Sequence, residues 1–375
     1  MPVFFVNSKS LKKDFLNFPY TLYKDDPHWV PPLRLERSEM MDVKKNPFFH
    51  HGEAVFFVAK NEGRVVGRIS AQINFLHNQR YQEKTGHFGF FDCIQSTQVA
   101  SELFDAASSW LISKGMTRMV GPMTLSINDE VGLLVEGYDS PPYPYMPHNW
   151  PYYESLLVQS GFTQIKDLIA WKYDAHKPVP IVAMQIAEAV KVHPGLKIRE
   201  VNLNKMEEEI KIISEVFNSA WSNNWGFIPW TSEELKKAAR DMKMILDPEI
   251  ALIAEVNGVP AAIAISIPNY HEVIRDLNGH LFPFGLFKLL YRLKTKKIKS
   301  ARLCLLGIKK EFRHDVLNGL SVLLYTEMHQ RGVKLAYHGG ELSWTLEDNE
   351  KINHGISLMG GVPYKKYRVF EKHIA

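Results

Sequence analysis

The sequence predicts an α/β protein made of two copies of one module. Each copy has the same order of elements: two apolar strands joined by a hairpin turn, a third strand, an amphipathic helix, a further strand, a short helix and a closing strand. Hairpin turns fall at Asn61–Gly63 and at Asn257-Gly258, and Asn149 and Asn349 each precede a short helix that a glycine ends 12 or 11 residues later. Short helices that end at glycine are common, so the shared order of all the elements carries the prediction.

The length of the chain, 375 residues, also suits two domains, which we place at residues 1–180 and 181–375. Hydrophobic residues make up 45% of the chain and charged residues 23%, so a folded globular protein is expected rather than a disordered one. The net charge of +4 fits an anionic cofactor and is too small to indicate a nucleic-acid partner.

Cysteine usage and hydropathy predict a soluble cytoplasmic protein. Cys93 and Cys304 lie far apart in the sequence, each inside an apolar run, which fits a reducing compartment better than a disulfide framework. The N-terminus lacks the long apolar stretch of a signal peptide. The most apolar segment, residues 250–268, contains Glu255 and a turn, so it predicts strand–turn–strand rather than a membrane span.

In the first half, residues 2–51 are rich in aromatics and proline and are predicted to be an irregular arm that wraps over the first sheet. Strand patterns follow, and then a helix that begins at Ser96 or Thr97 and ends at Gly115. The expected ranges are strands over 54–74 and 86–94, the helix over 96–115, a strand over 117–123, a loop-rich stretch over 126–150, a short helix over 151–162 and a strand over 163–174.

The second half opens with a linker, residues 175–195, and then repeats the pattern. A second helix is entered through Thr231 or Ser232, which are both favourable N-caps. The expected ranges are helices over 206–221 and 232–246, a strand hairpin over 250–268, a basic amphipathic stretch over 281–299, and strand, basic turn, helix, strand, helix and strand over 302–371.

The basic turn in this last stretch suits an anion. An apolar strand that opens through such a turn into a helix points free backbone N–H groups and the positive end of the helix dipole at a ligand. An ordinary strand–helix loop is the alternative, since a basic turn with one glycine is a weak signal. The residues that would surround the anion are Arg313, His314, Asn318, Gly319 and Leu320.

This order of elements resembles the GNAT superfamily of N-acyltransferases, here in two tandem copies that cover most of residues 50–175 and 197–372. The resemblance implies that each module is a mixed, mostly antiparallel sheet flanked by helices. It also implies that the strand before the basic turn presents backbone groups to the pantetheine arm of acyl-CoA, while the turn holds the pyrophosphate. The implied cofactor residues on that strand and at the start of the last helix are Leu306, Gly307, Ile308 and Asn349.

The whole chain also resembles a family of bacterial GNAT-like proteins, which share motifs similar to DPHWVPPL, NPFFHHGE, NDEVGLLVEGY and ELSWTLEDN. The resemblance implies acetyl-CoA or another acyl-CoA as one substrate. The implied acceptor is an amine on a small molecule or a peptide. The acceptor's identity, the acyl chain length and the oligomeric state stay open at this point.

The two modules depart from the family pattern to different degrees. In the first module the turn at residues 95–101, QSTQVAS, has no glycine and no basic residue, so this module is not expected to bind CoA in the usual way. In the second module the turn keeps an arginine and a glycine, but it is longer than usual and carries Asp315.

Three residues are candidates for catalysis. The resemblance places Glu341, at the end of the strand after the helix, near the acyl group, where it would act as the general base for an amine. A salt-bridged carboxylate is the alternative. Tyr364 and Tyr367 follow the last helix, and one of them would protonate the leaving thiolate; packing on an alternating strand is the alternative.

Two further groups are candidates for substrate binding. Asn128, Asp129 and Glu130 form a polar cluster between apolar segments that would select a substrate, or they begin a turn, which asparagine and aspartate favour. Trp225 belongs to an aromatic group over residues 221–230 that would line a pocket or fill the core.

The histidines show no metal-ligand spacing, so no metal is expected.

The stretch 281–299 combines apolar residues with a basic tail. It would contact a membrane surface, an acyl chain or an anionic cofactor, or it is a solvated helix that caps the second module.

The first hypothesis is therefore an acyl-CoA-dependent N-acyltransferase whose second module binds acyl-CoA. A GNAT-like protein that only binds a ligand or partner is the alternative, because a fold can outlast its activity. A FemX-like transferase that uses aminoacyl-tRNA is a further alternative, against which the small net charge and the missing helical arm argue.

Overall fold

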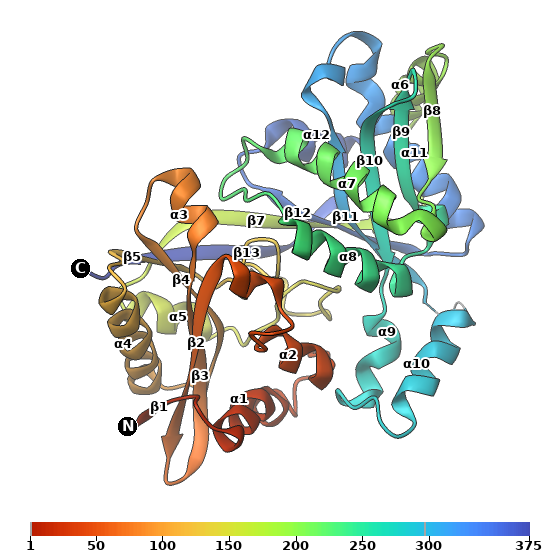
Figure 1. Ribbon diagram of the computed structural model, residues 1–375. Coiled ribbons are helices and arrows are strands. Elements are labelled where there is room, and N and C mark those ends of the chain that lie inside the picture. The colour runs from red at the N-terminus through yellow and green to blue at the C-terminus, as the bar shows by residue number, and fades with distance from the viewer. Residues whose placement is uncertain (1, 296–297) are drawn as a thin grey trace. The chain divides into compact units, whose positions relative to one another are not determined.

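The computed structural model describes residues 2–295 and 298–375, and the chain forms two compact units (Figure 1). Unit 1 comprises Met1–Leu168, Ile274–Leu286 and Lys365–Ala375; unit 2 comprises Ile169–Val273 and Phe287–Tyr364. Each unit has a mixed sheet flanked by helices, which confirms the predicted fold class. The module boundary between residues 180 and 181 stays a prediction, because compact units need not coincide with repeated modules.

The sheet of unit 1 has the order β1-β2-β3-β4-β5-β13, with β6 also beside β13. Its register pairs are antiparallel except between β4 and β5. The elements are β1 (Val3–Phe5), α1 (Lys9–Leu22), α2 (Arg34–Met40), β2 (Gly52–Asn61), β3 (Arg64–Asn74), α3 (Phe75–Tyr81), β4 (Thr85–Cys93), α4 (Thr97–Ser113), β5 (Arg118–Gly121), β6 (Leu133–Glu136) and α5 (Tyr153–Gln159).

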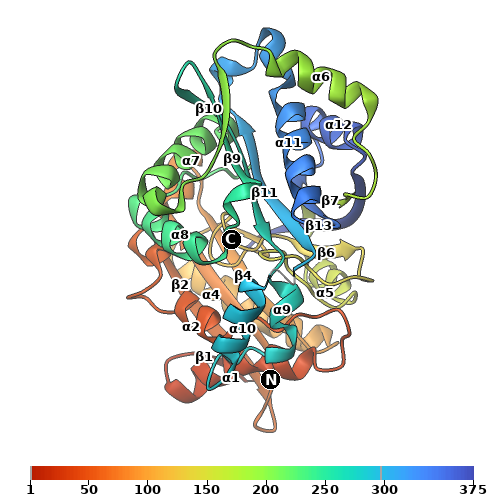
Figure 2. The ribbon, with the colours of Figure 1, turned by 90° about the vertical axis from the view of Figure 1, so that its right-hand side faces the viewer.

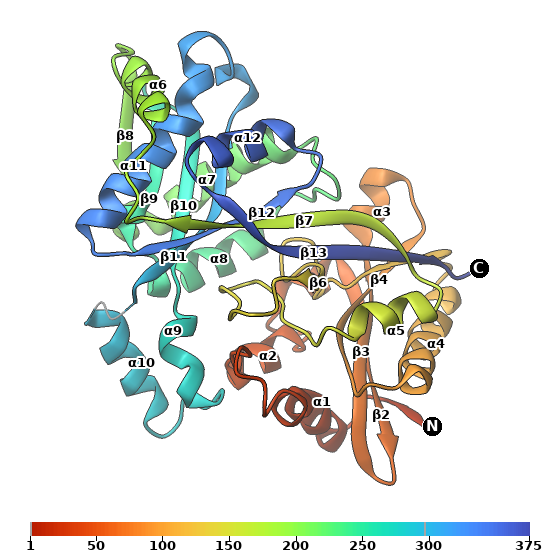
Figure 3. The same cartoon turned by 180° about the vertical axis from the view of Figure 1, so that it is seen from behind.

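Helices cover both faces of this sheet. Alternate residues of β2 point to opposite faces, so Phe56 and Val58 pack with Phe15 of α1, while Phe57 and Ala59 belong to the core under α4 and α5. Figure 3 shows α4 and α5 together on their side of unit 1. Because helices cover both faces, β3 is buried from Gly67 to Asn74 and β4 is buried along its whole length, although both strands carry polar side chains.

The N-terminal arm does cover the sheet, but it is not irregular. Ser8 caps α1 by accepting from the N–H of Leu11, and the helix continues through Pro19 in its final turns. The prediction of an irregular arm was wrong, because it rested on the many prolines and aromatics of residues 2–51, and these do not prevent helix α1. The buried Phe15 and Phe18 anchor the helix on the sheet, and tertiary packing outweighs the lost backbone hydrogen bond.

The sheet of unit 2 has the order β12-β11-β10-β9-β8. It is antiparallel except between β11 and β12. The elements are α6 (Ile181–Lys191), β8 (Leu196–Glu200), α7 (Met206–Trp221), α8 (Ser232–Ile245), β9 (Ala251–Val256), β10 (Val259–Pro268), β11 (Ser300–Ile308), α11 (Leu320–Lys334), β12 (Gly339–Leu346) and α12 (Glu350–Leu358).

Unit 2 is layered in the same way. In Figure 2, α7 and α8 lie on one side of β9–β11, and α6, α11 and α12 lie on the other. Ile253 and Ile263 join the core of α7 and α8, whereas Leu252 and Ala262 join the core of α6 and α11.

The linker predicted at residues 175–195 contains a helix, α6. Its proline-rich start was read as linker, but Pro180 serves as the N-cap position and leaves the following residues free to form a helix. Ala183, Ala187 and Val190 form the buried face of α6, which packs on α11.

Four elements have residues in both units: β7 (Thr163–Asp174), α9 (His271–Ile274), α10 (Gly285–Lys294) and β13 (Val362–His373). The part of β13 that belongs to unit 1 pairs antiparallel with β5, from Phe370↔Gly121 to His373↔Arg118. The last strand of the second module thus completes the sheet of the first unit.

Both predicted hairpins are confirmed. The β2–β3 turn places Glu62 and Gly63 at φ 48° and 80°, and the β9–β10 turn places Asn257 and Gly258 at φ 51° and 79°. Two successive left-handed residues match the twist of the flanking strands. The order of elements repeats from β1 in unit 1 and from β8 in unit 2, so the repeat extends into the N-terminal arm.

Candidate active site

The parallel strands β11 and β12 of unit 2 pair with each other only over their first residues. Their register pairs, among the residues that the structure describes, run from Ser300↔Gly339 to Leu303↔Leu342. Gly340 permits this close pairing, because a Cβ there would lie 2.0 Å from the Ala301 carbonyl oxygen. β11 continues along β10 to Ile308, so beyond Leu303 its β12-facing edge has no register partner in β12.

A buried polar cluster lies where this pairing ends. Glu341 lies near the start of β12, not at its end as the sequence predicted, because the strand begins only at Gly339. It is fully buried, and Arg302, its register partner on β11, is nearly so. The Arg302 Nε atom donates to the Ser343 hydroxyl at 2.8 Å and lies 3.4 Å from Glu341 Oε1. The hydroxyls of Ser343 and Tyr364 both donate to the Glu341 carboxylate. A buried carboxylate is stable only when it is paired and hydrogen-bonded, as this one is.

Cys304 borders the same cluster. Burial raises the pKa of its thiol; the nearby Arg302 opposes this shift and Glu341 adds to it. The thiol is therefore held in its neutral form and is a poor candidate for a nucleophile.

The structure brings two of the three predicted catalytic residues together. Tyr364 contacts Glu341 directly. Tyr367 lies on the part of β13 that belongs to unit 1, where it is fully buried and opposite Leu134 of β6. The sequence analysis missed Arg302 and Ser343; the only signal is a charged residue at the start of an apolar strand and a serine two positions after Glu341.

The three strand residues predicted to bind the cofactor lie at the end of β11. Leu306, Gly307 and Ile308 close β11 and pair with Ala264, Ile263 and Ala262 of β10. A glycine is required in the middle, because a Cβ at Gly307 would lie 2.2 Å from the Trp221 ring of α7.

Arg313 and Gly319, in the turn after β11, contact other parts of the protein. The Arg313 guanidinium donates to the carbonyls of Ile308 at 2.9 Å and Ala220 at 3.1 Å, and burial lowers its pKa. Gly319 lies under α6, where a Cβ would be 2.7 Å from Ile186. Of the predicted residues here, His314 and Asn318 are exposed, and Leu320 is fully buried as the first residue of α11.

Two lysines at this turn were missed by the sequence analysis. Lys309, directly after β11, is buried and pairs with Glu215 of α7; Lys310 donates to Asn223 at 3.2 Å. The signal was the pair of lysines that ends the apolar run LCLLGI. Asn349, the other predicted cofactor residue, is the N-cap of α12 and accepts from the Ile352 N–H at 3.4 Å.

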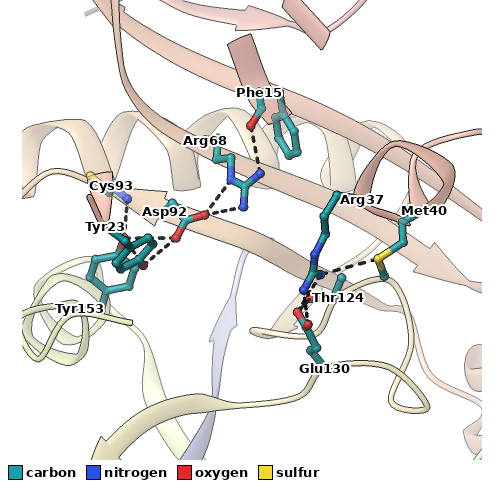
Figure 4. A network of polar contacts seen from close by, with 10 residues as sticks. All are labelled: Phe15, Tyr23, Arg37, Met40, Arg68, Asp92, Cys93, Thr124, Glu130 and Tyr153. Carbon is teal, nitrogen blue, oxygen red and sulfur yellow. Dashed lines mark hydrogen bonds and ion pairs between the residues drawn. The ribbon is translucent and has the colours of Figure 1, made fainter. Parts of the chain in front are cut away.

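The predicted substrate residues fall in separate units. Asn128, Asp129 and Glu130 form a turn in unit 1, in which Glu130 makes a two-bonded ion pair with Arg37 of α2 (Figure 4). Burial acts to lower the pKa of Arg37, but Glu130 outweighs it and the pKa is raised. Trp225 lies partly exposed in the turn after α7 of unit 2. Substrate binding by these residues stays a prediction.

The equivalent strand edge in unit 1 is closed. The β4–β5 register pairs end at His87↔Val120, and Met123 then donates to the Phe88 carbonyl at 2.7 Å. At the end of β4, the Cys93 N–H donates to the Tyr153 hydroxyl at 2.9 Å, and the Tyr152 hydroxyl donates to the Cys93 carbonyl at 2.7 Å. These backbone groups correspond to those that a GNAT domain would offer to pantetheine.

A second buried cluster of polar side chains surrounds Asp92, near the end of β4 (Figure 4). Asp92 of β4 accepts from the Tyr23 hydroxyl and from Arg68 Nε, each at 2.7 Å, and Arg68 also donates to the Phe15 carbonyl at 2.9 Å. Burial raises the pKa values of Tyr23 and Tyr153 well above their ordinary value, so both hydroxyls keep their protons. The cluster ties α1, β3, β4 and α5 of unit 1 together.

The His, Cys, Asp and Glu side chains of the described residues form no group of three that could hold a metal ion. No helix in the same parts of the chain combines the length and apolar character needed to cross a lipid bilayer.

Comparison with known proteins identifies the family. The chain is 40% identical to protein YghO of Escherichia coli (strain K12) over 376 aligned positions, which cover 99% of this chain and 94% of YghO. It is 39% identical over 362 positions to a protein of Caulobacter vibrioides named bacterial ceramide synthase, with 96% of this chain and 94% of that protein covered. None of the protein-family models compared with the sequence matches it.

The solved structures agree on the fold. A tandem GNAT protein from the clavulanic acid biosynthesis pathway superposes with a TM-score of 0.61 over 100% of this chain and 99% of its own, at 13% identity. The chain belongs to the family of YghO and the bacterial ceramide synthase. Its fold is that of tandem GNAT proteins. In this chain unit 2 has the open strand edge, and unit 1 has a closed one.

Proposed function

We propose that this tandem GNAT protein is an N-acyltransferase that moves an acyl group from CoA to the amine of a lipid acceptor. The observation that carries the proposal is the Glu341 carboxylate, bonded to the Tyr364 hydroxyl where β11 and β12 separate. The name of the Caulobacter relative supports a lipid acceptor, because a ceramide is the amide of a fatty acid and a long-chain amino alcohol.

The proposed reaction is a direct attack. The acyl-CoA thioester lies along the open edge of β11, where backbone N–H groups bind the pantetheine arm and polarise the carbonyl. The amine nitrogen attacks the carbonyl carbon, the carbon–sulfur bond breaks, and Glu341 accepts the proton that the amine loses. Tyr364 gives its proton to the CoA thiolate and regains one from Glu341, so the amine proton ends on the thiol. Arg302 and Ser343 hold the carboxylate in position.

Three substitutions test these roles. Tyr364→Phe should lower kcat about a hundredfold or more with little change in KM, since the hydroxyl acts on the leaving group. Glu341→Gln should lower kcat by a similar factor. Because it also leaves Arg302 buried beside a neutral amide, its thermal unfolding must be measured alongside. Tyr367→Phe is the matched control; if it, and not Tyr364→Phe, abolishes turnover, the assigned proton donor is wrong.

Ligand binding separates catalysis from a binding role. Acetyl-CoA or a longer acyl-CoA at a hundredfold excess over its Kd should stabilise the protein by about 2.7 kcal/mol in thermal unfolding. Turnover is followed by mass spectrometry of the amide, with acceptors that include a long-chain amino alcohol and a short amine. If no acyl-CoA stabilises the protein and no amide forms, a GNAT-like binding protein becomes the better description.

A further inference from the structure

Unit 2 contains a cavity on the α11 face of its sheet, distinct from the open edge of β11. It encloses about 580 Å³ of space, counted with the solvent at its mouth. Its walls come from the second half of α11, the first residues of β11 and β12, β7 and the end of α12.

The lining favours an uncharged, flexible ligand. Most of the wall is apolar, and among the described residues no lysine or arginine lines it. The polar Tyr173 and His329 bond each other at 2.7 Å, and burial lowers the pKa of His329, which keeps its ring neutral. Met328 and Met359 have unbranched, polarizable side chains that adapt to ligands of different shape.

Gly332 keeps part of this space empty. It lies within α11, where glycine costs about 0.5–1 kcal/mol relative to alanine. This position has room for a side chain, because the nearest atom to an added Cβ would be the Tyr337 Cβ at 4.0 Å. The missing side chain therefore serves the cavity rather than the packing of the helix.

The cavity wall also includes Glu341, whose carboxylate is part of the polar cluster. We infer that this cavity holds the unbranched alkyl chain of one of the two substrates, with the reacting end beside Glu341. The inference rests on the proposed function, and the chain belongs either to the acyl group or to the amine.

The test narrows the cavity at Gly332. Gly332→Leu adds four carbons to the wall. Gly355→Leu is the matched control, because it replaces a glycine of α12 at which a Cβ meets nothing within 4 Å. Acyl-CoAs of increasing chain length are assayed with one short amine, and amines of increasing length with acetyl-CoA. Because each methylene excluded from an apolar site costs about 0.8 kcal/mol, Gly332→Leu should lower kcat/KM for the longest chain at least about tenfold in one series.

The series that responds identifies the substrate whose chain the cavity holds. Short substrates should react with the variant as with the wild type, and Gly355→Leu should leave both series unchanged. An unchanged chain-length dependence in both series would overturn the inference. Met328→Trp, which narrows the cavity one turn earlier on α11, replaces Gly332→Leu if that variant does not fold.

Binding keeps the cavity testable if no amide forms. The uncharged fluorescent probe N-undecyl dansylamide should bind to wild type and Gly355→Leu, and at least about tenfold more weakly to Gly332→Leu. Probe binding without turnover would contradict the proposed function and leave the cavity inference standing. No binding to wild type, or equal binding to all three proteins, would contradict the cavity inference.

An independent observation concerns the segment around α10. Four aromatic side chains within ten residues are each more than 60% exposed: Phe282 (75%), Phe284 (77%), Phe287 (72%) and Tyr291 (62%). Phe284, Phe287 and Tyr291 follow helical spacing, and the outward face of α10 is therefore apolar.

This face carries positive charge. Lys288 lies within it and is exposed, and the exposed Lys299 follows α10 in the sequence. Exposed aromatics with neighbouring lysines are the composition of helices that lie in the interface of an anionic bilayer. We propose that residues 281–295 bind the surface of an anionic membrane, from which a lipid acceptor would be taken.

Vesicle co-sedimentation tests this proposal. Wild type should bind vesicles of phosphatidylcholine with phosphatidylglycerol, more weakly at high salt, and should bind pure phosphatidylcholine less. Phe284→Ser with Phe287→Ser should reduce binding at least about tenfold, whereas Phe75→Ser, at an exposed phenylalanine of α3, should not. Equal binding of the double variant and wild type, or no binding by wild type, would sink the proposal.

Discussion

His87, on β4, is a buried titratable group that the proposed chemistry does not use. Its side chain is almost inaccessible, its Nδ1 atom has no hydrogen-bond partner among the described residues, and its ring lies 4.9 Å from that of His77. Burial lowers the pKa of His87 well below its usual range, and His77 and Arg118 lower it further. The folded protein therefore holds His87 neutral.

Stability should consequently fall in acid. Below about pH 6.5 the unfolded chain binds a proton at His87 that the folded protein excludes, so unfolding becomes more favourable by up to about 1.4 kcal/mol per pH unit. Urea unfolding at pH 7.5, 6.5 and 5.5 measures this slope. His87→Gln should flatten it relative to wild type, whereas the exposed His50→Gln should not. Parallel slopes for wild type and His87→Gln would contradict the assignment.

Elements whose signals are local could be predicted from the sequence. The hairpins at Glu62-Gly63 and Asn257-Gly258 follow from turn chemistry, and α8 from the capping box of Thr231 and Glu234. α1 and α6 were missed because proline marked them as irregular, while their helical state is set by packing on other elements.

The candidate site shows the same division. Glu341 and Tyr364 were singled out through the family resemblance, and their hydrogen bond joins residues 23 positions apart. Arg302 could not be recognised, because its partners lie 39 and 41 positions away and only the parallel pairing of β11 and β12 brings them together. The hydrogen-bond partners of side chains could also not be predicted from the sequence. Arg313 is a residue type that binds anions, but its guanidinium donates to two carbonyls of the protein.

The N-terminus of α11 gives a prediction at the scale of one element. Asn318→Asp puts a carboxylate at an exposed position just before the helix N-cap, Gly319. It should stabilise the protein slightly, by about 0.3–1 kcal/mol, through the helix dipole. It should also weaken acyl-CoA binding several-fold, because the carboxylate repels the pyrophosphate.

Thermal unfolding without ligand and titration with acyl-CoA measure the two effects. Asn61→Asp, at an exposed position of the β2–β3 hairpin, serves as the control, since it adds the same charge in unit 1, whereas α11 belongs to unit 2. If Asn318→Asp changes stability but not acyl-CoA affinity, the pyrophosphate is bound elsewhere.

At the scale of the whole molecule, one fold occurs twice and its strand edge is used in two ways. In unit 2 the edge of β11 is open beyond Leu303. In unit 1 the Met123 N–H and the hydroxyls of Tyr152 and Tyr153 form hydrogen bonds with the corresponding backbone groups of β4. The expectation that the first module does not bind CoA in the usual way thus acquires a physical reason, and it stays a prediction until binding is measured.

The contribution of β13 to unit 1 can be tested by breaking its backbone pairing. Lys372 pairs in register with Met119 of β5, and proline there removes an N–H donor and disturbs the strand, at a cost of about 3 kcal/mol. Hydrogen–deuterium exchange of Lys372→Pro should rise in peptides of β4 and β5, while peptides of α7 and β9 in unit 2 stay protected. Lys372→Ala, which keeps the backbone N–H, should exchange like wild type. Equal loss of protection in both units would mean that they unfold as one.

The same strand sets an order of events during biosynthesis. The residues of unit 1 up to Leu168 leave the ribosome first, but the β13 residues that pair with β5 begin at Phe370, after all of unit 2 has been translated. Until then the β5 edge is an unpaired template to which another chain could add. The nascent chain must therefore protect this edge through most of its synthesis. Slow translation or a missing chaperone would first cause misfolding of the N-terminal half.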